Sequence, residues 1–482
     1  MTNQPSQRPN FLFIIPDQHR WDFMPDNPEL PLKMPTIQSL IQRGLRFNQA
    51  IVNTPLCAPC RASLASGRSY HSCGVMDNQQ DLPATLPTFY QQLRESGYRV
   101  AGVGKFDLHK SSSYWGLDGS KCLSTWGFTD GIDNEGKWDA IFSGTETPQG
   151  PYMKMLHDRG LAKTHADDYA NRGGRPGPGV ISYKNTNPTP LPDDVYCDNW
   201  IAQNAIDTLQ TLPNNTPWFM QVNFSGPHEP MDITGSMHAD CQGLDYPSPL
   251  AAEPQSASTI NSIRQNYGAM LENIDQRIRD ILVAVEDKGD LSNTIIVYSS
   301  DHGDMLGDHN EWAKSRPWQS SVAVPLVIAG PGIIKGQSDA LVQLTDLAAT
   351  FIDLAAAKPL PNMDARSIVP VLHGHTSRHR TMLHSGLRQT AGLARIYDGK
   401  AGWSPEKVDA PSEKQWEMVW DGRYKLVIEK DQNPIMYDLL SDPDETQDVS
   451  QDRPDQYNKL THAIKNEMAR VGADLPTSID EI

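Results

Sequence analysis

The chain has 482 residues, with 42 Lys and Arg against 59 Asp and Glu, and therefore a net charge of −17. This length allows a large hydrophobic core and about two structural units. A chain this acidic is a poor candidate for wrapping nucleic acid or coating an anionic membrane, so we expect neither partner. An anionic substrate would have to be held by locally clustered Arg, Lys and His side chains.

Short apolar segments alternate along the chain with helical patterns. The expected strands are residues 11–15, 98–104, 218–224, 294–300 and 325–330. The expected helices include residues 35–44, with Gly44 as the stop, residues 88–97 and residues 262–288. Strands that alternate with helices predict an α/β fold, in which a mostly parallel sheet is sandwiched by helices.

Polar side chains follow directly after several of the expected strands. Asp17, Lys105 and His228 each come at or just after the end of one strand, and Asp301 and His302 follow a fourth. Ligands of such sheets gather beyond the carboxyl ends of the strands. We therefore expect these side chains to share one site.

The segment of residues 57–67 predicts a short helix with a thiol near its start. Pro59 suits the first helical position, and Gly67 suits the C-terminal stop. Cys57 would then lie at the positive end of the helix, where a thiolate is favoured. Two other interpretations stay open: a thiol–disulfide site using Cys57 and Cys60, and a buried helix start with two inert thiols.

Two oxygen-rich pairs, Asp17-Gln18 and Asp301-His302, are candidates for a metal site. Hard divalent cations such as Ca²⁺ prefer carboxylate and carbonyl oxygens, while an imidazole also admits Mn²⁺. For a single Asp after a strand, a turn or a helix cap is the common alternative role.

Two segments carry a resemblance to a known family. Residues 57–67 have the form Cys-x-Pro-x-Arg followed by Ala-Ser-Leu-x-x-Gly, which resembles the signature of the type I, formylglycine-dependent sulfatases. Residues 301–309, followed by Trp312-Ala313-Lys314, resemble the second signature region of that family. The resemblance implies an alkaline-phosphatase-like α/β fold.

The resemblance also implies the reactive groups. Cys57 would be oxidised by a formylglycine-generating enzyme, and the hydrated aldehyde would be the nucleophile. Asp17, Asp301 and His302 would hold one divalent cation together with an oxygen of the modified Cys57. Ca²⁺ is the first expectation and Mn²⁺ the second.

Roles for the remaining polar residues follow from the same resemblance. Arg61, Lys105 and Lys314 would stabilise the oxygens of a transferring sulfuryl group, and His228 would protonate the leaving alcohol. Many sulfatases have a His two residues after the lysine, where this chain has Asp107, so His109 is the candidate for that imidazole role. These cationic residues and His228 are also expected to bind substrate.

Gln18 departs from the family pattern. Many sulfatases have a second Asp there, and an Asp-Gln start looks more like choline sulfatases and phosphonate monoester hydrolases. The amide oxygen of Gln18 would then either ligate the cation or contact substrate.

The resemblance covers nearly the whole chain and implies a catalytic domain over residues 8–375. Residues 376–482 would form a smaller α+β subdomain, with a turn at Asp421-Gly422 between strands and a closing helix near residues 456–471. Residues 110–195 show no clear periodicity, so we expect insertions at the mouth of the site that choose the substrate.

The leading hypothesis is a sulfatase that acts on a carbohydrate or small organic sulfate. Its alternatives are a phosphonate monoester or phosphodiester hydrolase with the same site, a thiol–disulfide protein, and a catalytically inactive binding protein in which Cys57 stays a thiol. A homo-oligomer is compatible with each hypothesis.

Six cysteines at residues 57, 60, 73, 122, 197 and 241 do not form a dense disulfide framework in a chain of this length. The polar residues 1–9 and the short apolar segment after them do not resemble a secretory signal. No apolar stretch approaches the roughly 18 residues needed to span a bilayer. We expect a cytoplasmic protein; a secretory segment removed from the N-terminus would instead imply the periplasm.

Overall fold

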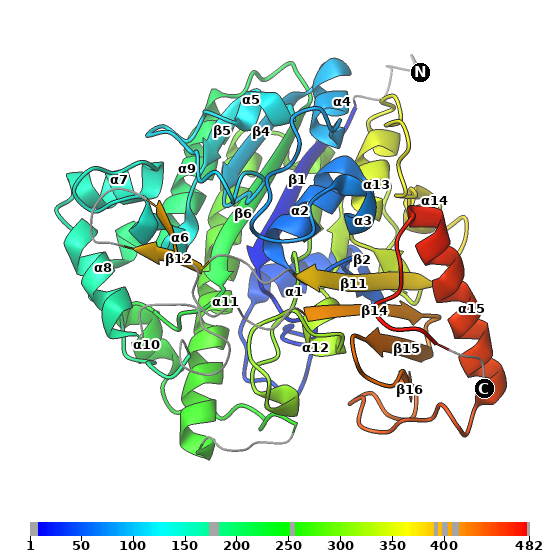
Figure 1. Ribbon diagram of the computed structural model, residues 1–482. Helices are drawn as coiled ribbons and strands as arrows, with labels where there is room; N and C mark the ends of the chain where they lie inside the picture. The colour runs from blue at the N-terminus through cyan, green and yellow to red at the C-terminus, as the bar shows by residue number, and fades with distance from the viewer. Residues whose placement is uncertain are drawn as a thin grey trace, which may run out of the picture.

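The computed structural model describes residues 8–172, 183–250, 256–389, 394–397, 403–406 and 414–479. Residues 1–7 of the polar N-terminal segment therefore lie outside the described chain. A large sheet lies between layers of helices, and a smaller sheet follows toward the C-terminus (Figure 1). No helix in the described ranges combines the length and apolarity that a bilayer crossing requires.

The large sheet has eight strands in the order β5-β4-β6-β1-β7-β8-β2-β9. They are β1 (Asn10–Asp17), β2 (Leu45–Phe47), β4 (Arg99–Gly104), β5 (Asp130–Asp133), β6 (Trp218–Pro227), β7 (Thr294–Tyr298), β8 (Val327–Ala329) and β9 (Gly336–Ser338). The pairs from β5 to β7 are parallel, whereas β8 is antiparallel to β7 and β2. The predicted mostly parallel sheet is confirmed.

The helices are described in chain order as follows. They are α1 (Pro35–Arg43), α2 (Cys57–Ser66), α3 (Tyr70–Cys73), α4 (Phe89–Glu95), α5 (Leu123–Trp126), α6 (Gly136–Phe142), α7 (Pro151–Asp158), α8 (Ala162–Asn171), α9 (Cys197–Thr211), α10 (Gly235–Cys241), α11 (Ala257–Asp287), α12 (Gln319–Val322), α13 (Asp346–Leu354), α14 (Val369–Leu372) and α15 (Pro454–Val471). The described chain also has one-turn 3-10 helices at Asp193–Val195, Leu291–Asn293 and Asp308–Asn310.

Strand β1 shows why the sheet needs helices on both faces. Phe11 and Phe13 pack in one buried cluster with side chains of α2, α4 and α13, whereas Leu12 and Ile14 pack in another with α9 and α11. Successive side chains of a strand point to opposite faces. Because both faces are buried, the strand is apolar along nearly its whole length rather than alternating.

The residues predicted to begin or end helices are found at helix ends, but some helices begin or end a few residues away from the predicted position. Thr88 caps α4 in a capping box with Gln91, and Gly67 ends α2 in the left-handed conformation with φ of 66°. The helix of Cys57 begins at Cys57 itself and not at Pro59, so the predicted start was two residues late. Gly44 follows the last residue of α1 with extended backbone, so it ends the helix without a left-handed cap.

The segment of residues 110–195, for which the sequence shows no clear periodicity, contains regular secondary structure. Its described residues contain α5 to α8, and β5 extends the large sheet beside β4. These elements are 4 to 10 residues long. Elements this short give too few turns for a hydrophobic period to stand out.

The smaller sheet forms a separate layer near the C-terminus. It has the order β11-β14-β15-β16, with β11 (Leu383–Gln389), β14 (Lys414–Trp420), β15 (Tyr424–Glu429) and β16 (Ile435–Asp438), all antiparallel. The predicted turn at Asp421-Gly422 joins β14 to β15, and α15 packs on one face of the sheet. Two small pairs complete the described strands, β3 (Ala50–Ile51) with β10 (Val342–Gln343) and β12 (Ala394–Tyr397) with β13 (Trp403–Glu406). The division at residue 375 stays a prediction.

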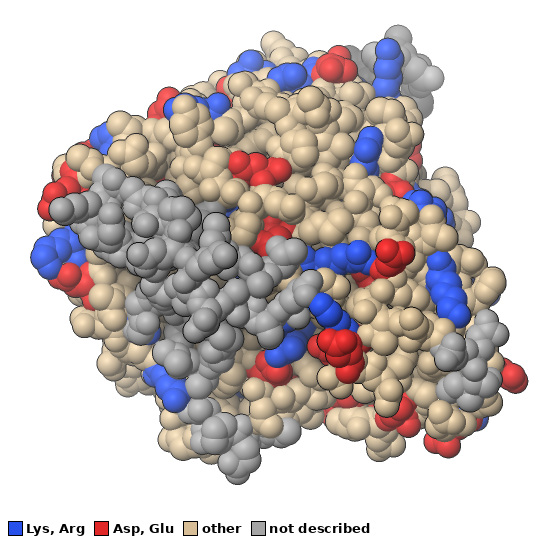
Figure 2. All heavy atoms as spheres, viewed as in Figure 1, with Lys and Arg blue, Asp and Glu red and all other residues tan. Residues whose placement is uncertain are grey.

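On the face drawn in Figure 2, basic and acidic side chains are interspersed among other residues. No single-sign field covers the described part of that face.

Gly104, directly before Lys105, provides a test of how closely β4 packs against β6 at the site. It ends β4 with φ of +111°, and a Cβ added there would lie 2.0 Å from the Asn223 carbonyl oxygen of β6. Gly104→Ala should therefore lower the free energy of unfolding by about 2–5 kcal/mol, from backbone strain and overpacking. Gly160→Ala is the control, because Gly160 also has positive φ but has no atom within 4 Å of the added Cβ. Its expected cost in denaturant unfolding is about 1–2 kcal/mol, and equal costs would contradict the steric argument.

Candidate active site

Four neighbouring strands bring the predicted polar residues to one edge of the sheet. Asp17 is the last residue of β1, Lys105 follows β4, and His228 follows β6. Asp301 and His302 come three and four residues after the end of β7. Since β4, β6, β1 and β7 are adjacent and parallel, their carboxyl ends meet, as the sequence predicted.

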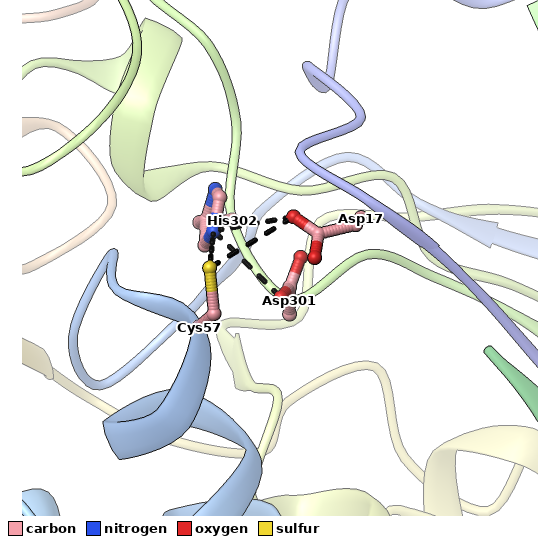
Figure 3. Close-up of side chains that lie close together, drawn as sticks. All are labelled: Asp17, Cys57, Asp301 and His302. Atoms are coloured by element: carbon pink, nitrogen blue, oxygen red, sulfur yellow. Dashed lines mark hydrogen bonds and ion pairs between the residues drawn. The ribbon is translucent and has the colours of Figure 1, made fainter. Parts of the chain in front are cut away.

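Asp17, Cys57, Asp301 and His302 point toward one another from three parts of the chain (Figure 3). One ligand atom of each lies within 4.8 Å of the others, and all four side chains are buried. The Cys57 Sγ is 3.3 Å from His302 Nε2 and 3.9 Å from Asp17 Oδ1. We call these four residues the ligand cluster.

Arg61 and Lys105 balance the negative charge of the ligand cluster. Arg61 Nε donates to Asp301 Oδ2 at 2.9 Å, Nη2 donates to Asp17 Oδ2 at 3.3 Å, and Nη1 donates to the Lys105 carbonyl oxygen at 2.6 Å. Lys105 Nζ forms an ion pair with Asp17. Burial by itself would raise the pKa of Asp17, but Lys105 and the other nearby cations hold it well below its usual value.

The same cations favour the thiolate of Cys57. Burial and the Asp17 carboxylate raise the pKa of the Cys57 thiol, whereas Lys314, Lys105 and His302 lower it, and the net shift is well below the ordinary value. Lys314 Nζ donates to Cys57 Sγ at 3.1 Å. The sulfur stands where an oxygen of a modified residue 57 would lie. An anionic or strongly polarised group at residue 57 is therefore stabilised by its surroundings.

Gln18 lies beside the cationic side of this cluster. Its Oε1 accepts a hydrogen bond from Lys314 Nζ at 2.7 Å. Its Nε2 faces three acceptors, Tyr183, Glu229 and Asp304. The amide oxygen thus points to the side that holds residue 57 and Lys314, where the sequence analysis expected it to act.

His228 and His109 differ in whether a ring nitrogen is free to contact a substrate. His228 Nδ1 lies 2.7 Å from the Glu229 carbonyl oxygen, and the described contacts leave Nε2 without a partner on a side chain that is 14% exposed. His109 Nε2 lies 2.7 Å from Asp133 Oδ2, and its Nδ1 accepts from the Tyr114 N–H at 2.9 Å. Both nitrogens of His109 are engaged outside the ligand cluster, so this arrangement does not support the imidazole role expected of it.

The ligand cluster fits a divalent cation. His302 Nδ1 lies 3.0 Å from the Gly303 carbonyl oxygen and donates to it in the tautomer that leaves the Nε2 lone pair facing the cluster. The two buried carboxylates are ligands that Ca²⁺ prefers, and the imidazole nitrogen is one that Mn²⁺ also accepts. The buried carboxylates also carry negative charge that a cation would offset, together with Arg61 and Lys105.

Cys60 does not share the environment of Cys57. Both thiols are free, and Cys60 packs in the apolar cluster behind α2. Burial, with Asp301 nearby, raises the pKa of Cys60 well above its ordinary value. Of the two thiols, Cys57 contacts His302 and Lys314, whereas Cys60 packs among apolar side chains, so this geometry favours the interpretation of Cys57 as a single reactive group.

Comparison with known proteins agrees with this geometry. The family model described as Sulfatase matches residues 9–357. The chain belongs to the sulfatase family. It is therefore an enzyme of the sulfuric ester hydrolase class.

Similar proteins cover most of the chain. A choline-sulfatase of Rhizobium meliloti (strain 1021) is 26% identical over 464 residues, which cover 90% of this chain and 81% of the relative. An arylsulfatase of Clostridium perfringens is 25% identical over 404 residues, covering 78% and 81%. Among solved structures, the phosphonate monoester hydrolase of Agrobacterium radiobacter superposes with a TM-score of 0.75 at 22% identity, covering 96% of each chain. The last comparison shows the shared alkaline-phosphatase-like fold.

Several residues around the site were not singled out from the sequence. Tyr183 and Glu229 contact Gln18, and Trp416 of β14 donates from Nε1 to the Ser315 carbonyl oxygen at 3.3 Å, beside Lys314. Glu229 directly follows His228, which was a local signal. Tyr183 and Trp416 lie far from every motif in sequence, and only folding places them here.

Arg61 gives a test of charge balance in the ligand cluster. Arg61→Met keeps most of the side-chain volume but leaves the carboxylates of Asp17 and Asp301 without their shared partner. Removing one member of a buried ion pair costs about 3–5 kcal/mol, so we expect a loss of that size in denaturant unfolding of the metal-free protein. Arg61→Lys, which keeps one charge, should lose clearly less. Equal stability of the two variants would show that Arg61 acts through packing alone.

Proposed function

We propose that this sulfatase hydrolyses a sulfate monoester of a small organic or carbohydrate alcohol to the alcohol and inorganic sulfate. The nucleophile is a formylglycine made from Cys57 by a formylglycine-generating enzyme, and one divalent cation assists it. The observation that carries the proposal is the contact of Cys57 with both the ligand cluster and Lys314. Names of relatives, a choline-sulfatase and an arylsulfatase, support a sulfate ester as substrate.

Lys105 and Lys314 supply the positive charge for an anionic substrate. Lys105 is buried and Lys314 is half-buried beside the ligand cluster, and interaction with Cys57 and Asp17 raises the pKa of Lys314 to about 12 although desolvation opposes it. Fixed cations in an enclosed site stabilise developing charge more strongly than cations in water. These two side chains hold the non-bridging oxygens of the sulfuryl group.

The ligand cluster, which includes residue 57, provides the nucleophile and the groups that activate it. Asp17, Asp301 and His302 would hold the cation, which when bound would lower the pKa of the hydroxyl that the hydrated aldehyde presents. Arg61 keeps both carboxylates in place through its hydrogen bonds to them. Helix α2 presents residue 57 at its N-terminus, the positive end of the helix.

His228 protonates the leaving oxygen. Its Nδ1 is held by the Glu229 carbonyl oxygen, with the Glu229 carboxylate 3.2 Å away, so the ring orientation is set while Nε2 stays available. A positioned imidazole of this kind transfers a proton efficiently near neutral pH. His109 serves a different purpose in this proposal, since it ties the loop after Lys105 to β5 through Asp133.

A second candidate function uses the same groups on a phosphonate monoester or phosphodiester. Gln18 in place of an acidic residue and the structural likeness to a phosphonate monoester hydrolase favour it. Both substrates are tetrahedral anions that Lys105 and Lys314 would hold in the same way. Comparison of kcat/KM for an aryl sulfate and an aryl phenylphosphonate separates the two, and the sulfatase proposal requires the higher value with a sulfate ester.

The two cysteines of α2 provide the test of the nucleophile. Peptide mapping should show that residue 57 has lost sulfur and gained oxygen in protein made together with a formylglycine-generating enzyme. Cys57→Ala should lower kcat/KM for the best sulfate ester by at least about 10³-fold. Cys60→Ala should keep most of the activity, because Cys60 is only packed behind the helix. Comparable loss of activity in both variants would support a dithiol site instead.

Metal removal tests the ligand cluster. Dialysis against a chelator should abolish activity and lower the melting temperature, because a bound cation stabilises the folded state. Ca²⁺ or Mn²⁺ should restore both, and elemental analysis should find one ion per chain. Asp301→Asn should weaken the measured metal affinity by at least about tenfold. The control is Asp167→Asn on the surface of α8, and full activity after complete metal removal would refute the proposed role of the cation.

A further inference from the structure

A single amide group links the cationic side of the site to a buried pair of carboxylates. Gln18 Nε2 lies 2.8 Å from Glu229 Oε2, 2.6 Å from Asp304 Oδ2 and 3.0 Å from the Tyr183 hydroxyl oxygen. On the other end, Oε1 accepts from Lys314 Nζ at 2.7 Å. We call Tyr183, Glu229 and Asp304 the amide clamp.

The two ends of this amide are not interchangeable. The NH₂ group only donates and the carbonyl oxygen only accepts. The side that holds Glu229 and Asp304 offers carboxylate acceptors, and the opposite side offers the ammonium donor of Lys314. A flipped amide would face two carboxylates with its oxygen and an ammonium with its NH₂ group, so every one of these charge-assisted hydrogen bonds would be lost.

The backbone of Gln18 is held independently of its side chain. Its N–H donates to Asp301 Oδ1 at 3.0 Å, and its carbonyl oxygen accepts from the Tyr267 hydroxyl at 2.6 Å. The backbone φ of Gln18 is 72°, a conformation that is uncommon for residues other than glycine. With the backbone fixed in this way, the amide clamp decides where the end of the side chain points.

The amide clamp is buried around the end of the Gln18 side chain. Tyr183 and Asp304 are 0% exposed and Glu229 is 5% exposed. The Tyr183 hydroxyl also lies 2.8 Å from Asp304 Oδ2, and its ring packs against Trp312 with centroids 5.1 Å apart. Trp312 comes two residues before Lys314, so the clamp touches the Lys314 loop through packing as well as through the amide.

We propose that Tyr183, Glu229 and Asp304 are positioning residues that lock the Gln18 amide with its oxygen toward Lys314, and thereby hold the Lys314 ammonium beside residue 57. This inference rests on the proposed role of Lys314 in binding the anionic group. It assigns to Tyr183, which comes from the segment between α8 and α9, a part in organising the catalytic cations. It also explains why residue 18 carries an amide, because a carboxylate there would be repelled by the carboxylates of Glu229 and Asp304.

The test measures binding of inorganic sulfate by calorimetry in a Cys57→Ala background, so that turnover and residue conversion play no part. Gln18→Glu should weaken sulfate binding by about tenfold or more, because the clamp then repels residue 18. Adding Asp304→Asn supplies a donor to residue 18 and should recover most of that loss. Adding Asp22→Asn instead gives the same net charge without a donor near residue 18, and should recover little.

A neutral substitution checks the same point without a change of charge. Tyr183→Phe removes one hydroxyl of the clamp and should weaken sulfate binding by about two- to fivefold. Tyr246→Phe is the matched control, because the Tyr246 hydroxyl is buried and has no hydrogen-bond partner in the described structure. In the protein with an intact residue 57, Gln18→Glu and Tyr183→Phe should both lower kcat/KM.

Three outcomes would overturn the inference. The first is unchanged sulfate affinity in both Gln18→Glu and Tyr183→Phe. The second is equal recovery by Asp304→Asn and Asp22→Asn, which would reduce the effect to net charge. The third is a lower melting temperature with unchanged affinity, which would make the clamp purely structural. A protein that binds sulfate normally but hydrolyses only phosphonates would refute the proposed function and leave the clamp intact.

Discussion

The burial of two carboxylates, Asp17 and Asp301, is the constraint on which the rest of the site depends. Removing such charges from water costs several kcal/mol each unless they are paired or bind a metal. Arg61 and Lys105 pair with Asp17 directly, and Arg61 joins it to Asp301. These pairs hold the two carboxylates beside the His302 imidazole and residue 57, and this set of ligand atoms fits a divalent cation.

This charge balance couples the site to the fold around it. Arg61 lies on α2 one turn beyond Cys57, so the helix that presents the reactive residue also carries the partner of the ligand carboxylates. The Arg61 guanidinium reaches the Lys105 carbonyl oxygen as well, which joins α2 to the end of β4. Residue 57, the other members of the ligand cluster and Lys105 are therefore held together as one unit.

Lys314 is held by a different set of elements. Its loop includes Ala313 and Ser315, which have φ of 60° and 72° on either side of Lys314. Left-handed residues other than glycine cost about 1–3 kcal/mol each and persist only where their surroundings impose them. Trp416 supplies part of that support by donating to the Ser315 carbonyl oxygen, so the C-terminal sheet stabilises the conformation that aims Lys314 at residue 57.

The resemblance to sulfatases named the four residues that the structure brings together in the ligand cluster. Sequence alone predicted the type of sheet and the residues at its strand ends, because hydrophobic period is a property of neighbouring residues. It placed the start of α2 two residues late and missed the short elements between residues 110 and 195, where the period is too brief to detect. Only the tertiary structure decided that Arg61 serves the carboxylates, that His109 is engaged elsewhere, and that Tyr183 and Trp416 support the site. Those outcomes depend on which distant side chains reach the same few ångströms, and no local pattern encodes that distance.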